Sequence, residues 1–271
     1  MRTAKKHPWM PEVKAAVWNR RFLCGGFLLA LAFLAAAYPY RSYLAGSGGS
    51  AEGPAWICVF LYSISSGQSL LFLPLFVPLA SAGNIQEELK SRYALFLVSR
   101  AGRKPYLAGK AAGAALSGGL TAAIAAGAAL AVIIPWCAGI PDVSAQAAEL
   151  AQAAAAAMDG PASAVQTAPG IRELLSAFAC CFLNGALWSL AGSLSSVLGR
   201  NPYLGYAVPF VLYYVLTVFQ ERYYEDLYFL SPRQWAYPSF YGAGVCAAIL
   251  LGLMAVLILF LVKLTERRLT G

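Results

Sequence analysis

Charged residues are scarce in this sequence. Of its 271 residues, 12% are Asp, Glu, Lys or Arg and 59% are hydrophobic, whereas soluble domains have about 25% charged and about 45–50% apolar residues. So few charges cannot cover the surface of a water-soluble particle of this size. The composition excludes a soluble globule and predicts an all-α polytopic membrane protein.

Metal ligands are also few. The single histidine, His7, lies in a basic leader before the first apolar run. Of the six cysteines the only close pair is Cys180 and Cys181, adjacent residues whose side chains diverge on a helix. Zinc sites need paired Cys or His at short loop spacings. We therefore expect neither a metal site nor a structural disulfide.

Six apolar runs approach the ~20 residues that a helix needs to cross a bilayer. The third run is too long for one straight span, so it should tilt, project beyond the bilayer or end before Pro135. A signal peptide is an alternative for the first run, but that run is longer than the usual h-region of about 7–15 residues. The six runs are Phe22–Tyr40, Trp56–Ala80, Tyr106–Trp136, Leu174–Leu198, Leu204–Phe219 and Tyr241–Val262.

The six runs contain no Asp, Glu or His, which excludes intramembrane aspartyl proteases, rhomboid-type Ser-His proteases and the acidic relays of many proton-coupled pumps. Residues Glu87 to Arg92 match the first motif of CAAX-protease-like enzymes, but no histidine follows to hold water or metal. Residues Arg103 to Lys110 depart from the P-loop pattern at both ends. The chain is therefore expected to be no enzyme and to bind no ATP.

Basic residues are distributed unevenly between the two sides of the predicted membrane domain. Sixteen of the twenty lie before the first span, between the second and third, at Lys110 near the start of the third, at Arg200, or after the sixth. The other side has the remaining four basic residues and eight of the twelve acids. The positive-inside rule therefore predicts cytoplasmic termini in a multi-pass protein of a bacterial cell membrane. Topology and lipid contact then explain the net charge of +8, so no nucleic-acid partner is expected.

The remaining segments lie outside the spans. Residues 1–21 form a basic segment in which Met10, Val13, Ala16 and Val17 share one helical face, which predicts an amphipathic helix in the inner headgroup layer. Residues 137–173 form an Ala-rich external connection, interpreted as a cap over the bundle. Residues 220–240 form a second external segment, rich in Tyr and Trp, which predicts a short interfacial or re-entrant element.

The segment between the second and third spans predicts a helix over 84–98. Asn84 can cap it, and Ile85, Leu89, Tyr93 and Phe96 form one apolar stripe. Glu87 with Lys90 and Glu88 with Arg92 have the spacing of helical ion pairs. The residues alone fit either a helix in the headgroup layer or a helix that docks on a partner.

This segment resembles the permease subunits of type-2 ABC transporters. Their pattern has an acidic cytoplasmic helix after the second span and then a basic phrase that enters the third. The same pattern is found here in Gln86-Glu87-Glu88 and in Leu97-Val98-Ser99-Arg100-Ala101-Gly102-Arg103-Lys104-Pro105-Tyr106-Leu107-Ala108-Gly109-Lys110. The six spans, the cytoplasmic termini and the aromatic loop before the sixth also match. The long external segment after the third span departs from the compact family pattern and leaves the subfamily and substrate open.

The resemblance implies a coupling helix that docks on a separate cytosolic ABC ATPase, where ATP and Mg²⁺ would bind. It also implies a second permease chain, identical or different, in the membrane. Glu87, Glu88, Arg92 and Arg100 are the expected ATPase-coupling residues, while Ile85 and Leu89 should face the membrane side. The alternative is a non-transport membrane protein, a sensor or assembly partner, that uses this helix as an anchor.

Polar residues inside the spans are candidates for a substrate path. Ser65, Gln68 and Asn184 are the nominated residues, because polar groups in spans tend to face protein or a cavity. Such a path would suit an exported amphipathic substrate, such as a peptide, a drug-like molecule or a lipid-linked molecule. The same groups also suit helix–helix hydrogen bonding, with Gly109/Gly113 and Gly185/Ser189 permitting close approach. The sequence does not separate these two roles.

Overall fold

The chain folds as an all-helical bundle. The computed structural model describes residues 19–46, 53–140, 170–224, 231–236 and 242–270, and every regular element in these ranges is a helix. Six helical segments are long and apolar enough to cross a membrane, which confirms the predicted membrane-type helical architecture. They are α2 (Arg20–Gly46), Gly67–Lys90, α7 (Arg103–Trp136), α9 (Ile171–Leu198), α10 (Leu204–Tyr223) and α12 (Gly242–Thr270).

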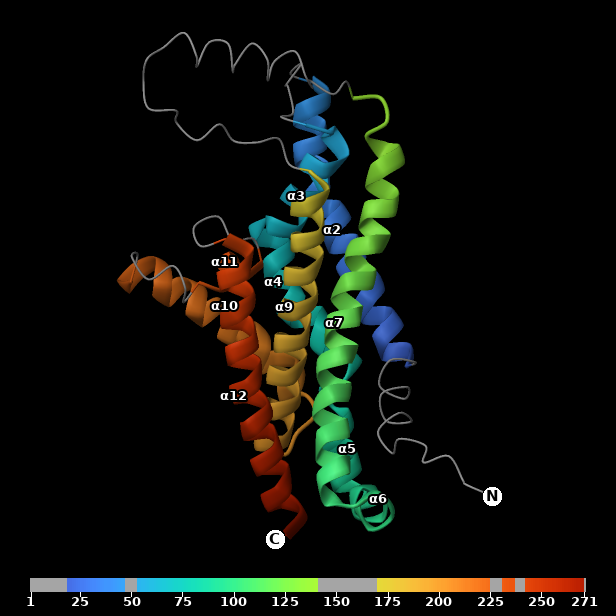
Figure 1. The fold of residues 1–271 in the computed structure, drawn as a ribbon, viewed down its shortest axis with the longest axis vertical. Coiled ribbons are helices and arrows are strands. Elements are labelled where there is room, and N and C mark those ends of the chain that lie inside the picture. Colours follow the sequence, from blue (N-terminus) through green and yellow to red (C-terminus); the bar gives the residue numbers. More distant parts are fainter. Residues whose placement is uncertain (1–18, 47–52, 141–169, 225–230, 237–241, 271) are drawn as a thin grey trace.

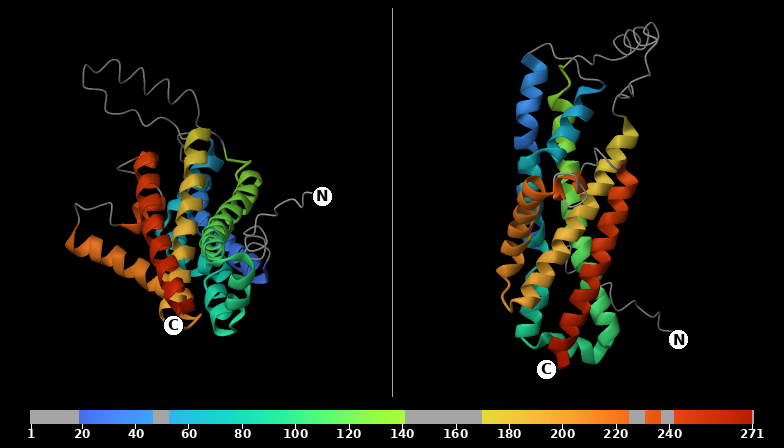
Figure 2. Two further views of the ribbon diagram at one scale, coloured as in Figure 1. Left: turned by 60° about the horizontal axis from the view of Figure 1, so that its bottom comes forward. Right: turned by 90° about the vertical axis from the view of Figure 1, so that its left-hand side faces the viewer.

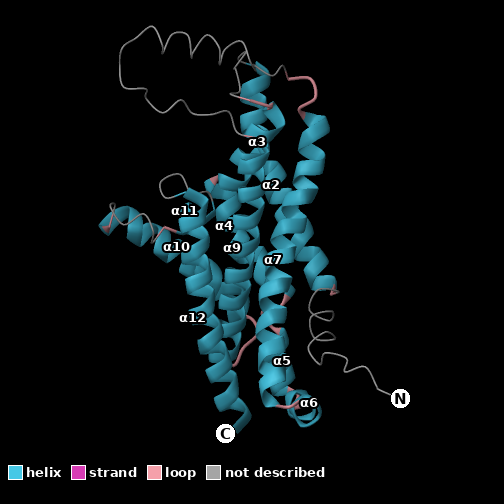
Figure 3. Cartoon of the chain, in the orientation of Figure 1, coloured by secondary structure: helices cyan, strands magenta, loops and turns pink. Residues whose placement is uncertain are grey.

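The long helices lie side by side along the longest axis, with α7 and α9 adjacent and α10 inclined away from the bundle (Figures 1 and 2). One end holds α5 (Asn84–Lys90), α6 (Tyr93–Ala101), the start of α7 and the end of α12. We call it the basic end. At the opposite end α2 and α7 finish and α3 (Ala55–Ser65) begins, while the short α11 (Pro232–Ala236) lies deeper in the bundle (Figure 3).

Most spans continue beyond the apolar runs that predict them. Helix α2 runs through Pro39 to Gly46, and α7 begins at Arg103 and runs through Pro135 to Trp136. The 34 residues of α7 measure about 51 Å, so it exceeds the ~30 Å hydrocarbon layer. Helix α12 extends to Thr270 and carries Arg267 and Arg268 in its last turn, where cations favour the helix dipole.

The second predicted span is interrupted rather than continuous. Helix α3 stops at Ser65, and the chain resumes as α4 (Gly67–Phe76) and the short 3₁₀ helix η1 (Val77–Ala80). Ser66 has an extended backbone, and its hydroxyl accepts a hydrogen bond from the Ser69 amide at 3.3 Å. This serine therefore caps α4, which explains why an apolar run of helical length does not form one helix.

The single helix expected over 84–98 is also corrected, because the structure divides it into α5 and α6. The break lies at Arg92, which has a left-handed backbone with φ 59° and ψ 7°. Asn84 is the first residue of α5 rather than its cap, and Gly83 takes the cap position without a side-chain hydrogen bond. The apolar stripe expected along one helix is thereby split between two.

Arg92 supplies a stability test. Replacing Arg92 by glycine is expected to raise the free energy of unfolding by up to about 1 kcal/mol, because a left-handed backbone costs an L-residue about 1–2 kcal/mol and glycine's own entropy cost offsets part of the gain. The measurement is the thermal midpoint of the detergent-purified protein. Ser91→Gly is the matched control, since Ser91 has φ −78° and should only lose stability. A lower midpoint for Arg92→Gly would contradict the two-helix geometry.

Small residues allow α7 and α9 to approach closely. A Cβ atom built on Gly118 of α7 would lie 2.2 Å from the Ser189 Cβ, and one on Gly185 of α9 would lie 2.6 Å from the Ala122 Cβ. The Ser189 hydroxyl donates to the Ala114 carbonyl at 2.7 Å. Ala122 belongs to a buried apolar cluster that also includes Phe33 and Phe60. Gly185 and Ser189 therefore lie at the close approach for which the sequence nominated them.

Some predictions concern residues outside the described ranges. These are the amphipathic helix expected within residues 1–21, apart from residues 19–21, and most of the external segment 137–173. Parts of the second external segment, residues 225–230 and 237–240, also lie outside the described ranges.

Candidate functional site

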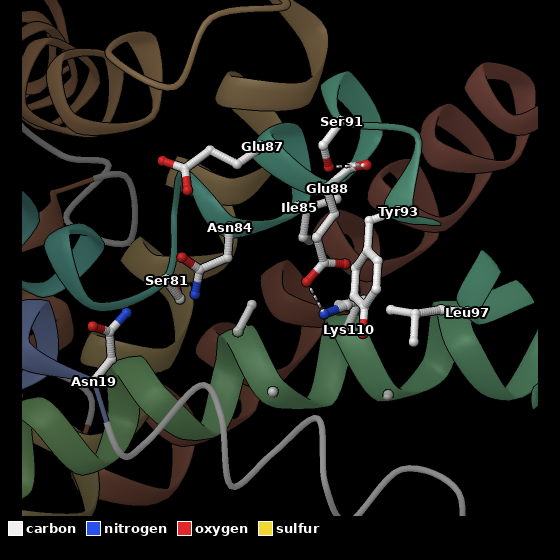
Figure 4. A pocket seen from close by; sticks show the side chains of 13 residues that line it. Asn19, Ser81, Asn84, Ile85, Glu87, Glu88, Ser91, Tyr93, Leu97 and Lys110 are labelled. Carbon is white, nitrogen blue, oxygen red and sulfur yellow. Dashed lines mark hydrogen bonds and ion pairs between the residues drawn. The ribbon is translucent and has the colours of Figure 1, made fainter. Parts of the chain in front are cut away.

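A cavity of about 680 Å³ opens at the basic end. The connection into α5, helices α5 and α6, and one face of α7 form its walls (Figure 4). Its lining residues are Asn19, Ser81, Asn84, Ile85, Glu87, Glu88, Ser91, Tyr93, Leu97, Gly109, Lys110, Gly113 and Ala114. Gly109 and Gly113, which the sequence nominated for helix packing, therefore face this cavity. The cavity brings both nominated carboxylates together with a lysine from the third span.

Glu88 binds groups on α7. Its carboxylate accepts from the Lys110 ammonium at 2.6 Å and from the Tyr106 hydroxyl at 3.1 Å. The Glu88 and Lys110 side chains are 21% and 13% exposed, so both charges are largely shielded from water. Charge-assisted hydrogen bonds in such surroundings are stronger than surface pairs. Glu88 thus ties α5 to the third span rather than projecting away from the protein (Figure 4).

Glu87 binds the first span instead. The Arg21 guanidinium, at the start of α2, donates to its carboxylate at 3.0 Å. Both side chains are about half exposed, and pairs of this kind contribute about 0–1 kcal/mol. The adjacent carboxylates of α5 therefore contact two different spans.

These tertiary pairs replace the local pairs expected from helical spacing. The sequence predicted Glu87 with Lys90 and Glu88 with Arg92. The left-handed turn at Arg92 ends the helical register after α5, so Glu88 and Arg92 no longer lie one turn apart on a common helix. The sequence analysis did not predict Lys110 as the partner of Glu88. Its position inside an apolar run could have indicated one, because a lysine there requires a hydrogen-bond acceptor.

The apolar residues of α5 pack against other helices. Ile85 is 2% exposed and lies in a cluster with Leu190 and Val197 of α9, and Leu89 packs against the same cluster. The expectation that these two residues face the membrane domain agrees with this packing. Helix α5 is thus fixed to the bundle by an apolar contact as well as by ion pairs.

Helix α6 presents a different surface. Tyr93, Leu95 and Phe96 are each about half exposed, and the Arg100 guanidinium lies 5.5 Å from the centre of the Phe96 ring. Ala94 is 1% exposed and packs on the bundle. Arg92 and Arg100 are therefore exposed beside aromatic side chains, whereas Glu88 is shielded.

The three residues nominated for a substrate path are separated. Gln68 is exposed on α4, and Ser65 is half-buried, donating to the Leu61 carbonyl at 2.8 Å. Asn184 is 2% exposed in the core of α9. A path on the surface of one chain can include Gln68 but cannot reach Asn184 without a rearrangement of the core.

Among the residues that the structure describes, no group of three or more His, Cys, Asp or Glu side chains is placed to hold a metal ion. Comparison with protein-family profiles found no match, and comparison with curated proteins found no significant similarity.

Proposed function

We propose that this chain is the membrane-spanning permease subunit of an ATP-driven transporter of the ABC-2 type. It would export an amphipathic substrate, with ATP and Mg²⁺ bound by a separate cytosolic ATPase. The resemblance of residues 86–110 to that family suggested this function. The observation that carries the proposal is the α5–α6 pair, which contacts three spans on one side and exposes aromatic and basic residues on the other.

The internal contacts of α5 suit the transmission of force. Arg21 connects Glu87 to α2, Lys110 connects Glu88 to α7, and Ile85 packs on α9. A displacement of α5 would therefore act on three spans together. In this arrangement Glu87 and Glu88 are positioning residues on the membrane side of the coupling element.

The exposed face of α6 suits the docking of a protein. Phe96 and Arg100 combine exposed aromatic and guanidinium groups, which are enriched in protein interfaces. We assign ATPase contact to this face together with Arg92. The positive-inside rule supports placing it in the cytoplasm, since the same end of the bundle carries Lys104, Arg267 and Arg268.

A second permease chain is part of the proposal. Helices α10 and α12 expose Val211, Leu212, Leu251 and Phe260. Such apolar surfaces suit lipid or a second permease, whereas water would be unfavourable.

Phe96→Ser is expected to reduce copurification of the cytosolic ATPase at least 10-fold, because an exposed aromatic anchor at an interface centre contributes about 2 kcal/mol or more. The measurement is the amount of ATPase retained on the affinity-purified permease, identified by mass spectrometry. Ile171→Ser is the matched control, since Ile171 is 70% exposed at the opposite end. Equal retention by both variants would contradict the docking face.

The alternative is a non-transport protein anchored at the membrane surface by α6, whose basic and aromatic residues also suit headgroups. In that case no ATPase would copurify with the unaltered chain. Phe96→Ser would then weaken only the binding to vesicles that contain anionic lipid.

A further inference from the structure

A charged pair lies beside the break in the second span. The Arg233 guanidinium of α11 donates to the Glu221 carboxylate of α10 at 2.6 Å. The sequence placed both residues in an external segment, 220–240. Helix α11 fits the re-entrant element expected there, because it lies well below the outer ends of α2 and α3 (Figures 1 and 2).

The depth follows from two neighbours of α11. Trp235 packs on Trp188 of α9 with ring centroids 6.4 Å apart. Helix α9, from Ile171 to Leu198, is about 41 Å long, and Trp188 lies about 25 Å from its first residue. A hydrocarbon layer about 30 Å thick includes Trp188 wherever it is placed along α9. Arg233, two residues before Trp235, is therefore at the depth of the membrane.

The second neighbour is Gly67, the first residue of α4, directly after the break at Ser66. A Cβ built on Gly67 would lie 3.8 Å from an Arg233 guanidinium nitrogen. At this point the helix is broken, and Gly67 and Gln68 are exposed. Irregular backbone at membrane depth occurs where it is covered by protein or lines a hydrated cavity.

Charge on this surface requires water or a polar partner. The Arg233 and Glu221 side chains are 50% and 46% exposed on the surface of one chain. Ionisable groups at membrane depth are unfavourable against lipid and face protein, ligands or water-filled space. The face formed by α4, α10 and α11 is therefore unsuited to contact lipid tails.

Two buried hydroxyls lie beside the ion pair. Tyr213 and Thr217 lie one turn apart on α10 and are 3% and 5% exposed. Among the described residues neither hydroxyl makes a hydrogen bond of ordinary length and angle, although the Tyr213 hydroxyl lies beside the Thr217 hydroxyl and the Arg233 guanidinium. Buried hydroxyls without such hydrogen bonds are unfavourable, so a bound polar group or water should satisfy them.

We propose that Gln68, Tyr213, Thr217, Glu221 and Arg233 form a hydrated binding site for the head of a zwitterionic amphiphile. A head with one charge would leave Glu221 or Arg233 unpaired, whereas a head with a phosphate and an ammonium pairs with both. The substrate role of this site rests on the proposed function, whereas binding is measured on the purified chain without an ATPase, so the two can fail separately.

Accessibility tests the hydrated face. Gln68→Cys and Leu251→Cys variants are placed in lipid nanodiscs and treated with a hydrophilic maleimide. Mass spectrometry then gives the labelling of each variant in excess of the labelling of the unaltered chain. Both positions are exposed on one chain, but Leu251 lies on the apolar surface of α12. We expect Cys at 68 to react at least 10-fold faster. Equally slow reaction at both positions would mean that lipid or a second chain covers the face, and would overturn the proposal.

Binding tests the ligand class. Short-chain dioctanoyl phosphatidylethanolamine should bind the detergent-solubilised chain saturably and at least 10-fold more tightly than dioctanoyl phosphatidylglycerol, read from the fluorescence of Trp188 and Trp235. Arg233→Gln and Glu221→Gln should each weaken binding at least 10-fold. Equal affinity for both lipids would overturn the zwitterionic assignment.

A charge swap separates recognition from folding. In this lipid the phosphate joins the glycerol and the ammonium is terminal, so the site should distinguish their order. The double variant Arg233→Glu with Glu221→Arg should restore the thermal midpoint lost in the single variants while binding stays at least 10-fold weaker. Recovery of both properties would show a purely structural ion pair and overturn the proposal.

Discussion

Gly118→Leu is expected to prevent native assembly of the bundle. The Cβ of any replacement meets the Ser189 Cβ at 2.2 Å and the Gly185 carbonyl oxygen at 2.5 Å, and both belong to the adjacent helix α9. Neither can move without separating the two helices. Overpacking of a well-packed core costs about 1–3 kcal/mol, and a whole leucine where a methyl group has no room should exceed about 3 kcal/mol.

The measurement is the yield of monodisperse protein on size exclusion and its thermal midpoint. Gly127→Leu is the matched control, because Gly127 lies on the same helix and a Cβ there meets nothing within 4 Å. We expect the control to behave like the unaltered protein. A normal midpoint for Gly118→Leu would contradict the α7–α9 contact.

The second large effect is expected at Lys110. In Lys110→Met the Glu88 carboxylate keeps the Tyr106 hydroxyl but loses its cation at 2.6 Å. Removing one partner of a fully buried pair costs about 3–5 kcal/mol. Since the Glu88 and Lys110 side chains are 21% and 13% exposed, we expect a smaller loss of about 2 kcal/mol, measured by chemical unfolding in detergent.

The double variant Lys110→Met with Glu88→Gln should regain most of the stability, because no charge is left unpaired. Its substrate-stimulated ATP turnover with a partner ATPase should stay low, since α5 is no longer tied to α7. Arg21→Met is the control on the exposed neighbouring pair and should cost no more than about 1 kcal/mol. Equal losses for Arg21→Met and Lys110→Met would contradict the shielded position of Glu88.

Several features of the fold could be predicted from the sequence, because they depend on composition along the chain. Runs of ~20 apolar residues have to be helical in a bilayer, since every backbone polar group needs an internal partner. The breaks were harder to predict. Ser66 caps a new helix and Arg92 adopts a left-handed backbone, although neither residue type requires a break by itself.

The candidate sites depended more strongly on tertiary contacts. Sequence spacing favoured Glu88 with Arg92, but α7 brings Lys110 within 2.6 Å. Likewise Asn184 and Gln68 appeared equivalent as the most polar groups of their spans, yet one is buried in the core and the other is exposed. Which neighbour a polar group meets depends on the packing of helices far apart in the chain.

The sequence by itself determined the membrane-type helical architecture, because apolar run length and scarce charge have few physical solutions. Only the tertiary structure decided how deep the segment after α10 lies. Arg233 and Glu221 follow the fifth apolar run, where the sequence predicts an external segment with a short interfacial or re-entrant element but does not indicate which helix that element packs against. The packing of Trp235 on Trp188 decides that α11 lies against α9 rather than beyond the end of the bundle, because burial of two large aromatic rings is favourable.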